Sequence, residues 1–287
     1  MTAGGTRAAD GRSGPSAPRY LFASWDEVER RVAHATRLAI FTDFDGTLVP
    51  IHRRAEDVRL PSNTRRLLAD LAERGHVLGI VSGRARDDVE RLVALRGLWY
   101  VGDHGFLLRA PGGRSAILAS HRQRTEIGTV TRELDRELRS VAGIRLECKD
   151  ATLAVHYRGA STRSRAIAAR AVSAVIRRHP RLRLMDGKKV WELLPAADVN
   201  KARVVRFILR WERRRAPAAR WLAIYIGDDI ADERVFAGWR GVSVAVGRLR
   251  PTGARYYVRS PAEVYAFLSR LKISGRDPSR AVPRSRG

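Results

Sequence analysis

Short apolar runs alternate with amphipathic segments along most of the chain. Up to residue 107, strands are predicted at RLAIFTDF, HVLGIVSGR and LWYVGDHG, and helices at SNTRRLLADLAERG and RARDDVERLVALRG between them. Ser62 is the expected N-cap of the first helix, and Gly75 follows its end. This βαβαβ order predicts a parallel sheet with helices on its faces.

The pattern changes after residue 107. Hairpins are predicted around Gly112–Gly113 in FLLRAPGGRSAILA and at Asp186–Gly187 in RLRLMDGKKVWELLP, and a strand pair that turns near Asp150 in IRLECKDATLAVHYRG. Residues 123–142 and 161–178 have the spacing of helices. Hairpins mixed with helices indicate an antiparallel sheet, and thus an α+β unit.

The first pattern resumes after Pro195. Its predicted elements are a helix at 200–214, the strand WLAIYIGDD, a helix at 231–237, the strands VSVAVG and RYYV, and a helix at 261–272. We therefore predict an α/β fold in which a doubly wound, mostly parallel sheet core, residues 20–107 and 196–273, is interrupted by an α+β insertion at 108–195. Residues 1–19 and 274–287 are predicted to be disordered tails, the second of them basic.

Composition is that of an ordinary globular protein, with 287 residues, 44% hydrophobic and 30% charged. No stretch approaches the roughly 18 consecutive apolar residues of a membrane-spanning helix, and the N-terminus lacks the apolar centre of a secretory signal. Cys148 is the only cysteine, so no intramolecular disulfide framework exists. These features predict a cytoplasmic protein without a membrane partner.

The net charge of +25 is unusual for a chain of this length. Residues 1–19 carry +2 and residues 273–287 carry +3, so +20 belongs to the predicted folded part. Such a field attracts anions, whether phosphorylated metabolites or nucleic acid. We interpret the charge as acidic surface positions replaced by arginine, and RWERRRAPAAR at 210–220 as a solvated helix end. The sequence around it has no aromatic stacking platform, so we predict no nucleic-acid partner.

Polar side chains cluster where the predicted strands end. These are Asp43 and Asp45, then Ser82, Gly83 and Arg84, then Asp103 and His104, then Asp228 and Asp229, with Asp232 and Glu233 a turn later. Lys201 opens the helix that follows the insertion. Ligands of an open parallel sheet bind beyond the carboxyl ends of its strands. We therefore expect one site to be assembled from these groups.

Residue type suggests the chemistry of this site. Asp43, Asp45 and Asp228 could converge on one hard divalent cation, and a hydroxyl and an ammonium, from Ser82 and Lys201, could hold phosphate oxygens. Because a strand repeats every two residues, both members of the first acid pair are expected on the same side. One would attack phosphorus and the other would act as general acid and base. The spacing of Asp43 and Asp45 also occurs in calcium-binding loops, but such a loop ends with glutamate at position 12. Counted from Asp43, this position is Arg54, so a calcium loop is excluded.

The motifs DFDGTL, SGR, a lysine before a helix and GDDxxDE, in this order, resemble the haloacid dehalogenase superfamily of phosphohydrolases. More narrowly, residues 36–272 resemble the trehalose-6-phosphate phosphatases, through GDHG, ECK, HYR, GKKVWELLP and GDDIADE. The chain departs from that family's pattern at Leu194, Ala202 and Ala231, and GDHG replaces a more usual Gly-Asn-His-Gly or Gly-Leu-His-Gly. The resemblance implies a haloacid dehalogenase-like core with an inserted α+β cap domain.

The resemblance also implies roles for individual residues. Asp43 would be the nucleophile and Asp45 the general acid and base. Mg²⁺ would be held by Asp43, Asp45, Asp228 and Asp229, and adjacent Asp228 and Asp229 could exchange direct and indirect contact with it. Phosphate or sugar would be bound by Thr47, Ser82, Gly83, Arg84, His104, Glu147, Lys149, His156, Arg158, Glu192 and Lys201. The alternatives are an exposed face of paired charges for the cap residues and an ordinary strand-end histidine for His104.

The expected function is therefore that of a Mg²⁺-dependent phosphatase in trehalose biosynthesis. It would hydrolyse trehalose 6-phosphate to trehalose and phosphate through an aspartyl phosphate. Two alternatives stay open: a phosphatase for another sugar or polyol phosphate, and a non-catalytic basic binding protein. The residues around Glu147 to Arg158, with Glu192, distinguish a trehalose-6-phosphate phosphatase from the first alternative. The presence of Asp45 argues against the second. The sequence determines neither the oligomeric state nor a synthase partner.

Overall fold

The computed structural model describes residues 17–274 except 53, 188, 198 and 248–250. Its larger sheet has nine strands among the described residues. In spatial order they are β1 (Arg19–Tyr20), β13 (Tyr256–Val258), β12 (Val242–Val246), β11 (Trp221–Gly227), β2 (Arg37–Thr42), β3 (Val77–Val81), β4 (Trp99–Gly102), β5 (Leu107–Arg109) and β6 (Ser115–Ile117). Neighbouring strands are parallel from β1 to β4, and β5 and β6 add an antiparallel hairpin at one edge. The predicted doubly wound, mostly parallel sheet is confirmed.

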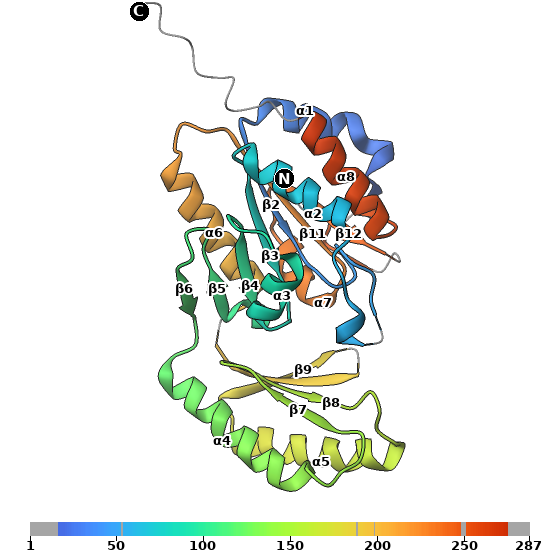
Figure 1. Cartoon of the computed structure of the whole chain (residues 1–287), viewed down its shortest axis with the longest axis vertical. Coiled ribbons are helices and arrows are strands. Elements are labelled where there is room, and N and C mark those ends of the chain that lie inside the picture. Colours follow the sequence, from blue (N-terminus) through green and yellow to red (C-terminus); the bar gives the residue numbers. More distant parts are fainter. Residues whose placement is uncertain (1–16, 53, 188, 198, 248–250, 275–287) are drawn as a thin grey trace, which may run out of the picture.

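Helices cover both faces of this sheet (Figure 1). One face packs against α1 (Trp25–His34), α2 (Ser62–Glu73), α3 (Arg86–Val93) and α8 (Pro261–Ser274), and the other against α6 (Lys201–Arg215) and α7 (Ile230–Phe236). Short 3-10 turns lie at η1 (Phe22–Ser24), η2 (Ala55–Asp57) and η3 (Asp103–Gly105).

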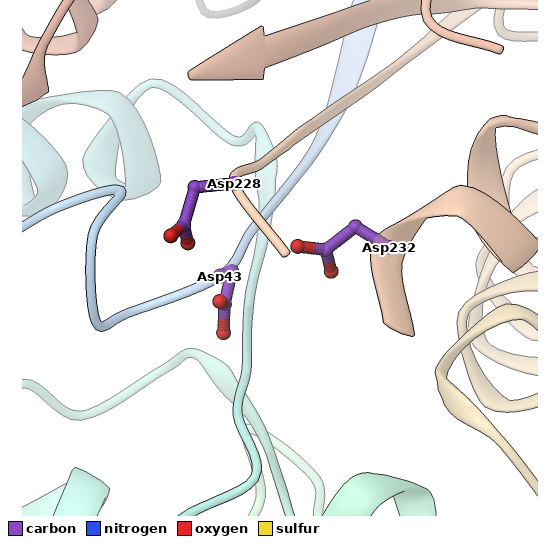
Figure 2. A group of neighbouring side chains, drawn as sticks. All are labelled: Asp43, Asp228 and Asp232. Carbon is purple, nitrogen blue, oxygen red and sulfur yellow. The ribbon is translucent and has the colours of Figure 1, made fainter. Parts of the chain in front are cut away.

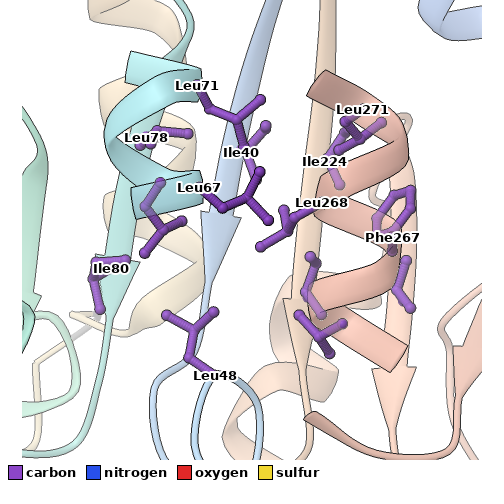
Figure 3. Packing of buried hydrophobic residues seen from close by; sticks show 14 of the residues in the cluster. Ile40, Leu48, Leu67, Leu71, Leu78, Ile80, Ile224, Phe267, Leu268 and Leu271 are labelled. Carbon is purple, nitrogen blue, oxygen red and sulfur yellow. The ribbon is translucent and has the colours of Figure 1, made fainter. Parts of the chain in front are cut away.

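Strand β2 shows why its sequence is a continuous apolar run. Leu38 and Ile40 belong to the core on one side of the sheet, and Ala39 and Phe41 to the core on the other. On the first side, leucines of α2 and α8 meet Ile40 between the two helices (Figure 3). A strand buried on both faces has no polar position to alternate with.

The second sheet contains, in spatial order, β7 (Arg145–Cys148), β8 (Leu153–His156), β10 (Val190–Pro195) and β9 (Leu182–Gly187), all antiparallel. Helices α4 (His121–Leu138) and α5 (Thr162–Arg178) pack on one face through Trp191, Leu193 and their neighbours. The other face is turned toward the carboxyl ends of the core strands (Figure 1). Alternation along β10 places Glu192 on that face.

Several strands and helices extend across the predicted domain boundaries. The boundary at 108 falls inside β5, and the hairpin around Gly112–Gly113 belongs to the nine-stranded sheet, because β5 pairs with β4. Arg19 was placed in the tail but forms β1 with Tyr20, and α8 includes Ser274. A local pattern identifies a hairpin but not the sheet edge that the hairpin extends.

Two predicted local signals also differ from the structure. Ser62 is the first residue of α2 rather than its cap, and Pro61 precedes it without a side-chain hydrogen bond. Proline before a helix presets the backbone, which explains the earlier start. The β9–β10 pairing continues through Gly187, so that turn lies beyond the predicted Asp186–Gly187. Among the described residues, no helix has the length and apolar character needed to cross a membrane.

Candidate active site

Three carboxylates meet where β2 and β11 end. Asp43 follows β2, and its N–H donates to the Ile226 carbonyl at 2.9 Å, which ties the two strand ends together. Asp228 follows β11, and Asp232 lies in the first turn of α7. One oxygen from each of the three lies within 4.8 Å of the others. Figure 2 shows these side chains approaching one another from three separate segments.

Lys201, at the start of α6, places a buried ammonium among these acids. Its Nζ lies 2.9 Å from Asp232 Oδ1 and 3.2 Å from Asp43 Oδ1. The side chain of Asn200 caps α6 by accepting from the Arg203 N–H, which fixes where the helix begins. Burial alone would lower the pKa of Lys201, but the neighbouring acids outweigh it and raise this pKa well above its ordinary value. The ammonium is therefore charged.

The site carries more negative than positive charge. Burial is the largest cause that raises the pKa of Asp43, with Lys201 opposing it and the acids at 228, 229 and 232 raising it further. Burial likewise raises the pKa of Asp232 to about 7. One ammonium does not balance this many carboxylates, and a hard divalent cation with oxygen ligands would. The residues present fit such an ion.

The loop after β2 is shaped to accept Asp228. Gly46 has a left-handed φ of 81°, and a Cβ atom there would overlap the Asp228 carboxylate. The hydroxyl of fully buried Thr47 donates to Asp228 Oδ1 at 3.2 Å. Glycine is needed at 46 both for its backbone conformation and for the room it leaves.

Asp45 does not join the acid group. Its two carboxylate oxygens accept from Arg84 Nε at 2.5 Å and Nη2 at 2.8 Å, a bidentate pair. Arg84 also binds Asp88 at 2.9 Å, and its own N–H donates to Ser82 Oγ at 3.1 Å. Strand β2 ends at Thr42, so the two-residue strand period used to place both acids on one side does not extend to 45.

Asp229 has a structural partner as well. Its side chain accepts from the Asp232 N–H at 3.0 Å, and Asp232 Oδ2 accepts from the Asp229 N–H at 3.0 Å, a reciprocal cap at the start of α7. Lys201 lies 3.8 Å from Asp229. Of the four residues expected to bind metal, the structure thus groups Asp43 and Asp228, and Asp232 completes the set.

The four-stranded sheet contributes a second group of side chains. Lys149 Nζ donates to the Gly83 carbonyl at 2.9 Å and lies 3.5 Å from Asp103 Oδ1 and 3.6 Å from Glu192 Oε1. The Glu192 carboxylate also contacts the His104 imidazole. Lys149 and Glu192, from the four-stranded sheet, therefore reach the loops that follow β3 and β4. We call the cluster of Gly83, Asp103, His104, Lys149 and Glu192 the seam.

Glu147 and His156 form a pair beside the seam. Their side chains are 2.8 Å apart, on adjacent strands β7 and β8. The hydrogen bond from His156 is the main cause that lowers the pKa of Glu147 to about 2. Arg158 lies beyond the end of β8 and is exposed.

Three residues gain importance that their sequence context did not assign. Asp232 was noted without a role, and Asp103 was only part of a motif. Tyr225 lies in the middle of apolar β11, where its hydroxyl donates to Asp232 Oδ1 at 2.7 Å. In the sequence, these residues could have been found as hydroxyl or carboxylate groups in or next to apolar strands. A buried polar group of this kind requires a hydrogen-bond partner, which marks it as part of a site.

Comparison with known proteins agrees with this arrangement. The family model described as trehalose-phosphatase matches residues 41–249. "Probable trehalose-phosphate phosphatase 2" of Oryza sativa subsp. japonica is 32% identical over 266 residues, with 84% of this chain and 69% of the relative covered. "Trehalose-phosphate phosphatase" of Mycobacterium avium is 34% identical over 249 residues, with 81% and 61% covered. The chain spans roughly two thirds of the length of these relatives.

Solved structures show the same fold. The C-terminal domain of Candida albicans trehalose-6-phosphate phosphatase has a TM-score of 0.74 at 20% identity, covering 91% of this chain and 99% of that one. A "trehalose-6-phosphate phosphatase related protein" has a TM-score of 0.68 at 26% identity, covering 82% and 97%. The family match extends over most of the chain and includes both the acid group and the seam. The chain belongs to the trehalose-phosphatase family.

Proposed function

We propose that this protein hydrolyses trehalose 6-phosphate to trehalose and phosphate with the help of Mg²⁺. The observation that carries the proposal is the juxtaposition of two groups of residues. A buried carboxylate, Asp43, lies against Lys201 and two further acids, and at the same sheet edge the seam joins Lys149 and Glu192 of the second sheet to the loops after β3 and β4. The first group suits phosphoryl transfer, and the second offers donors and acceptors to sugar hydroxyls.

In this mechanism, Asp43 attacks phosphorus. The new Oδ–P bond replaces the P–O bond to the sugar, and Asp45 delivers a proton to the departing sugar oxygen. Asp45 then takes a proton from water, whose oxygen attacks the aspartyl phosphate and releases phosphate and free Asp43. Asp43, Asp228 and Asp232 would hold Mg²⁺, which supplies positive charge to the phosphate oxygens.

Arg84 links substrate arrival to the proton donor. Its guanidinium holds both oxygens of Asp45 in the structure. A phosphate group competes for the same bidentate donor, so its binding would release the Asp45 carboxyl toward the leaving oxygen. Ser82 and Lys201 would bind the remaining phosphate oxygens.

We also propose that residues 121–195 act as a cap. The polar face of their sheet is turned to the site, and Lys149 and Glu192 contact the core loops. Closing this unit over the substrate would exclude water and position the sugar. Glu147, His156 and Arg158 stay predicted sugar contacts, and the cytoplasmic location stays a prediction.

The test is phosphate release from a panel of sugar and polyol phosphates with purified protein and Mg²⁺. We expect a clear preference for trehalose 6-phosphate, and loss of turnover in excess chelator that added Mg²⁺ restores. Asp43→Asn should lower kcat by at least about a thousandfold while the fold is kept. Equal rates across the panel would reject the substrate, and full activity of the variant would reject the mechanism.

A further inference from the structure

Asp103 is a buried carboxylate of the seam that takes no part in the proposed phosphoryl transfer. It lies in η3, directly after β4, and its side chain is fully buried. Among the described residues, neither of its carboxylate oxygens has a hydrogen-bond partner. The nearest cation, Lys149 Nζ, is 3.5 Å from Oδ1, which is too long for a strong hydrogen bond. A buried acceptor of this kind calls for a donor.

The backbone holds Asp103 in an unfavourable conformation. Its φ is 48°, and that of His104 is 56°, so two consecutive non-glycine residues are left-handed. Side chains disfavour this conformation, so the surrounding contacts must hold it in place. The Asp103 N–H donates to the Arg84 carbonyl at 2.9 Å, and a Cβ at Gly102 would overlap the Arg86 backbone. These contacts fix the carboxylate between the phosphate-binding loop and the cap.

The neighbours of Asp103 do not satisfy it. Lys149 gives its hydrogen bond to the Gly83 carbonyl and shares its charge with Glu192. Glu192 and exposed Asp150 add negative charge nearby, and the His104 ring faces Glu192. Within the seam, the Asp103 carboxylate therefore remains a hydrogen-bond acceptor without a donor.

We propose that Asp103 accepts a hydroxyl group of the substrate's sugar and so determines specificity for a hydroxyl-rich phosphate ester. This inference rests on the proposed function. Sugar hydroxyls supply the O–H donors that the two oxygens lack. A phosphate ester without such hydroxyls would leave this buried acceptor unpaired and would therefore bind more weakly.

The same contact makes sugar binding depend on pH. Burial is the main cause that raises the pKa of Asp103 to about 7, with Lys149 opposing it and Glu192 and Asp150 adding to it. Hydroxyl donors bind the ionised form, so the pKa falls when the sugar binds. Affinity is therefore full above about pH 7 and decreases by up to about tenfold per unit below it.

Steady-state kinetics with two Asp103 variants and one control variant test this assignment. Asp103→Leu, which cannot accept a hydrogen bond, should raise KM for trehalose 6-phosphate about tenfold or more, and it should not raise KM for phenyl phosphate, which has no hydroxyl to donate. Asp103→Asn keeps an acceptor, so its KM for trehalose 6-phosphate should stay within a few-fold of the unmodified protein's at about pH 8. Its KM should not increase below about pH 7, because asparagine does not take up a proton there. Asp150→Asn removes an exposed charge nearby, and its KM should still increase below about pH 7. Equal losses on both substrates would reduce Asp103 to a structural role and overturn the proposal.

A binding measurement separates this inference from the proposed function. Calorimetry of trehalose binding to the Asp43→Asn protein, in two buffers of different ionisation enthalpy near pH 6.5, counts the protons released. We expect release with Asp103 present and none after Asp103→Asn. Trehalose binding without proton release, unaffected by Asp103→Leu, would overturn the inference alone. No trehalose binding and no trehalose 6-phosphate turnover would overturn the proposed function and this inference with it.

Discussion

Single residues of the site depend on one another through charge. Lys201 is buried between Asp43 and Asp232, and Tyr225 donates to the same Asp232 oxygen. Removing any one of these groups would leave a buried charge or acceptor without its partner, which costs several kcal/mol. Asp43, the proposed nucleophile, is thus held by a network. The network requires lysine at 201 because a compact ammonium fits where a planar guanidinium does not.

Gly46 offers a test at this scale, because Gly97 provides a matched control. Both have left-handed φ, 81° and 82°, but a Cβ at Gly46 would overlap Asp228, whereas at Gly97 it meets nothing within 4 Å. Each glycine-to-alanine change should cost about 1 kcal/mol of unfolding free energy. Only Gly46→Ala should also raise the Mg²⁺ concentration needed for half-maximal activity, by about tenfold or more.

Urea unfolding and Mg²⁺ titration of both variants check this prediction. An unchanged Mg²⁺ requirement in Gly46→Ala would show that the position of Asp228 does not depend on the space at 46.

Elements position these residues through their ends. Strands β2 and β11 are paired in register from Arg37–Trp221 to Thr42–Ile226, so the acids that follow them emerge side by side. Helix α7 begins with a reciprocal cap in which Asp229 and Asp232 each accept from the other's N–H. Asp232 uses only Oδ2 in this cap, so its Oδ1 remains directed to Lys201 in the cluster.

His76, just before β3, links element packing to pH. It is buried, and its Nδ1 accepts from the Leu38 N–H at 3.4 Å. Burial, followed by Arg74 and Arg37, lowers its pKa to about 4. The unfolded chain binds the proton at higher pH, so stability is full above about pH 6.5 and declines as the pH falls toward about 4.

In urea unfolding, the free energy of unfolding should therefore fall by on the order of 2–3 kcal/mol over this pH range. The His76→Gln variant should not show this decrease. Exposed His121 is the control, and His121→Gln should keep the loss. Identical pH curves for the protein and His76→Gln would contradict the assignment.

The whole molecule carries a field that the individual contacts do not reveal. The chain has a net charge of +25, so its long-range electrostatic field is positive although the site itself is rich in acids. A positive field raises the encounter rate of an anionic substrate and is screened by salt. We expect kcat/KM for trehalose 6-phosphate to fall several-fold between about 20 mM and about 500 mM salt, while affinity for neutral trehalose stays constant.

Kinetics and calorimetry over this salt range measure the two quantities. A parallel fall in both would assign the effect to the fold rather than to steering. A salt-sensitive gel shift with nucleic acid would instead revive the binding function that the sequence argued against.

The sequence by itself determined the doubly wound core and the residues that meet at the ends of its strands. A two-faced parallel sheet has a strong apolar signature, and the polar group after each strand marks the same edge. Resemblance in the motifs then indicated the chemistry. Sequence patterns did not predict two features that depend on more distant contacts. Asp45 lies beyond the end of β2 at Thr42 and pairs with Arg84. The β5–β6 hairpin pairs with β4 and so extends the larger sheet.

Only the tertiary structure decided how charge is shared across distant segments. It placed Asp232 rather than Asp45 or Asp229 with Asp43 and Asp228: Arg84 holds Asp45, whereas Asp232 caps α7 with one oxygen and directs the other to Lys201. The structure also buried Asp103 beside Lys149. Burial and pairing depend on residues far apart in the chain, and they set which carboxylates meet, which one an arginine holds and which one, among the described residues, is buried without a hydrogen-bond donor.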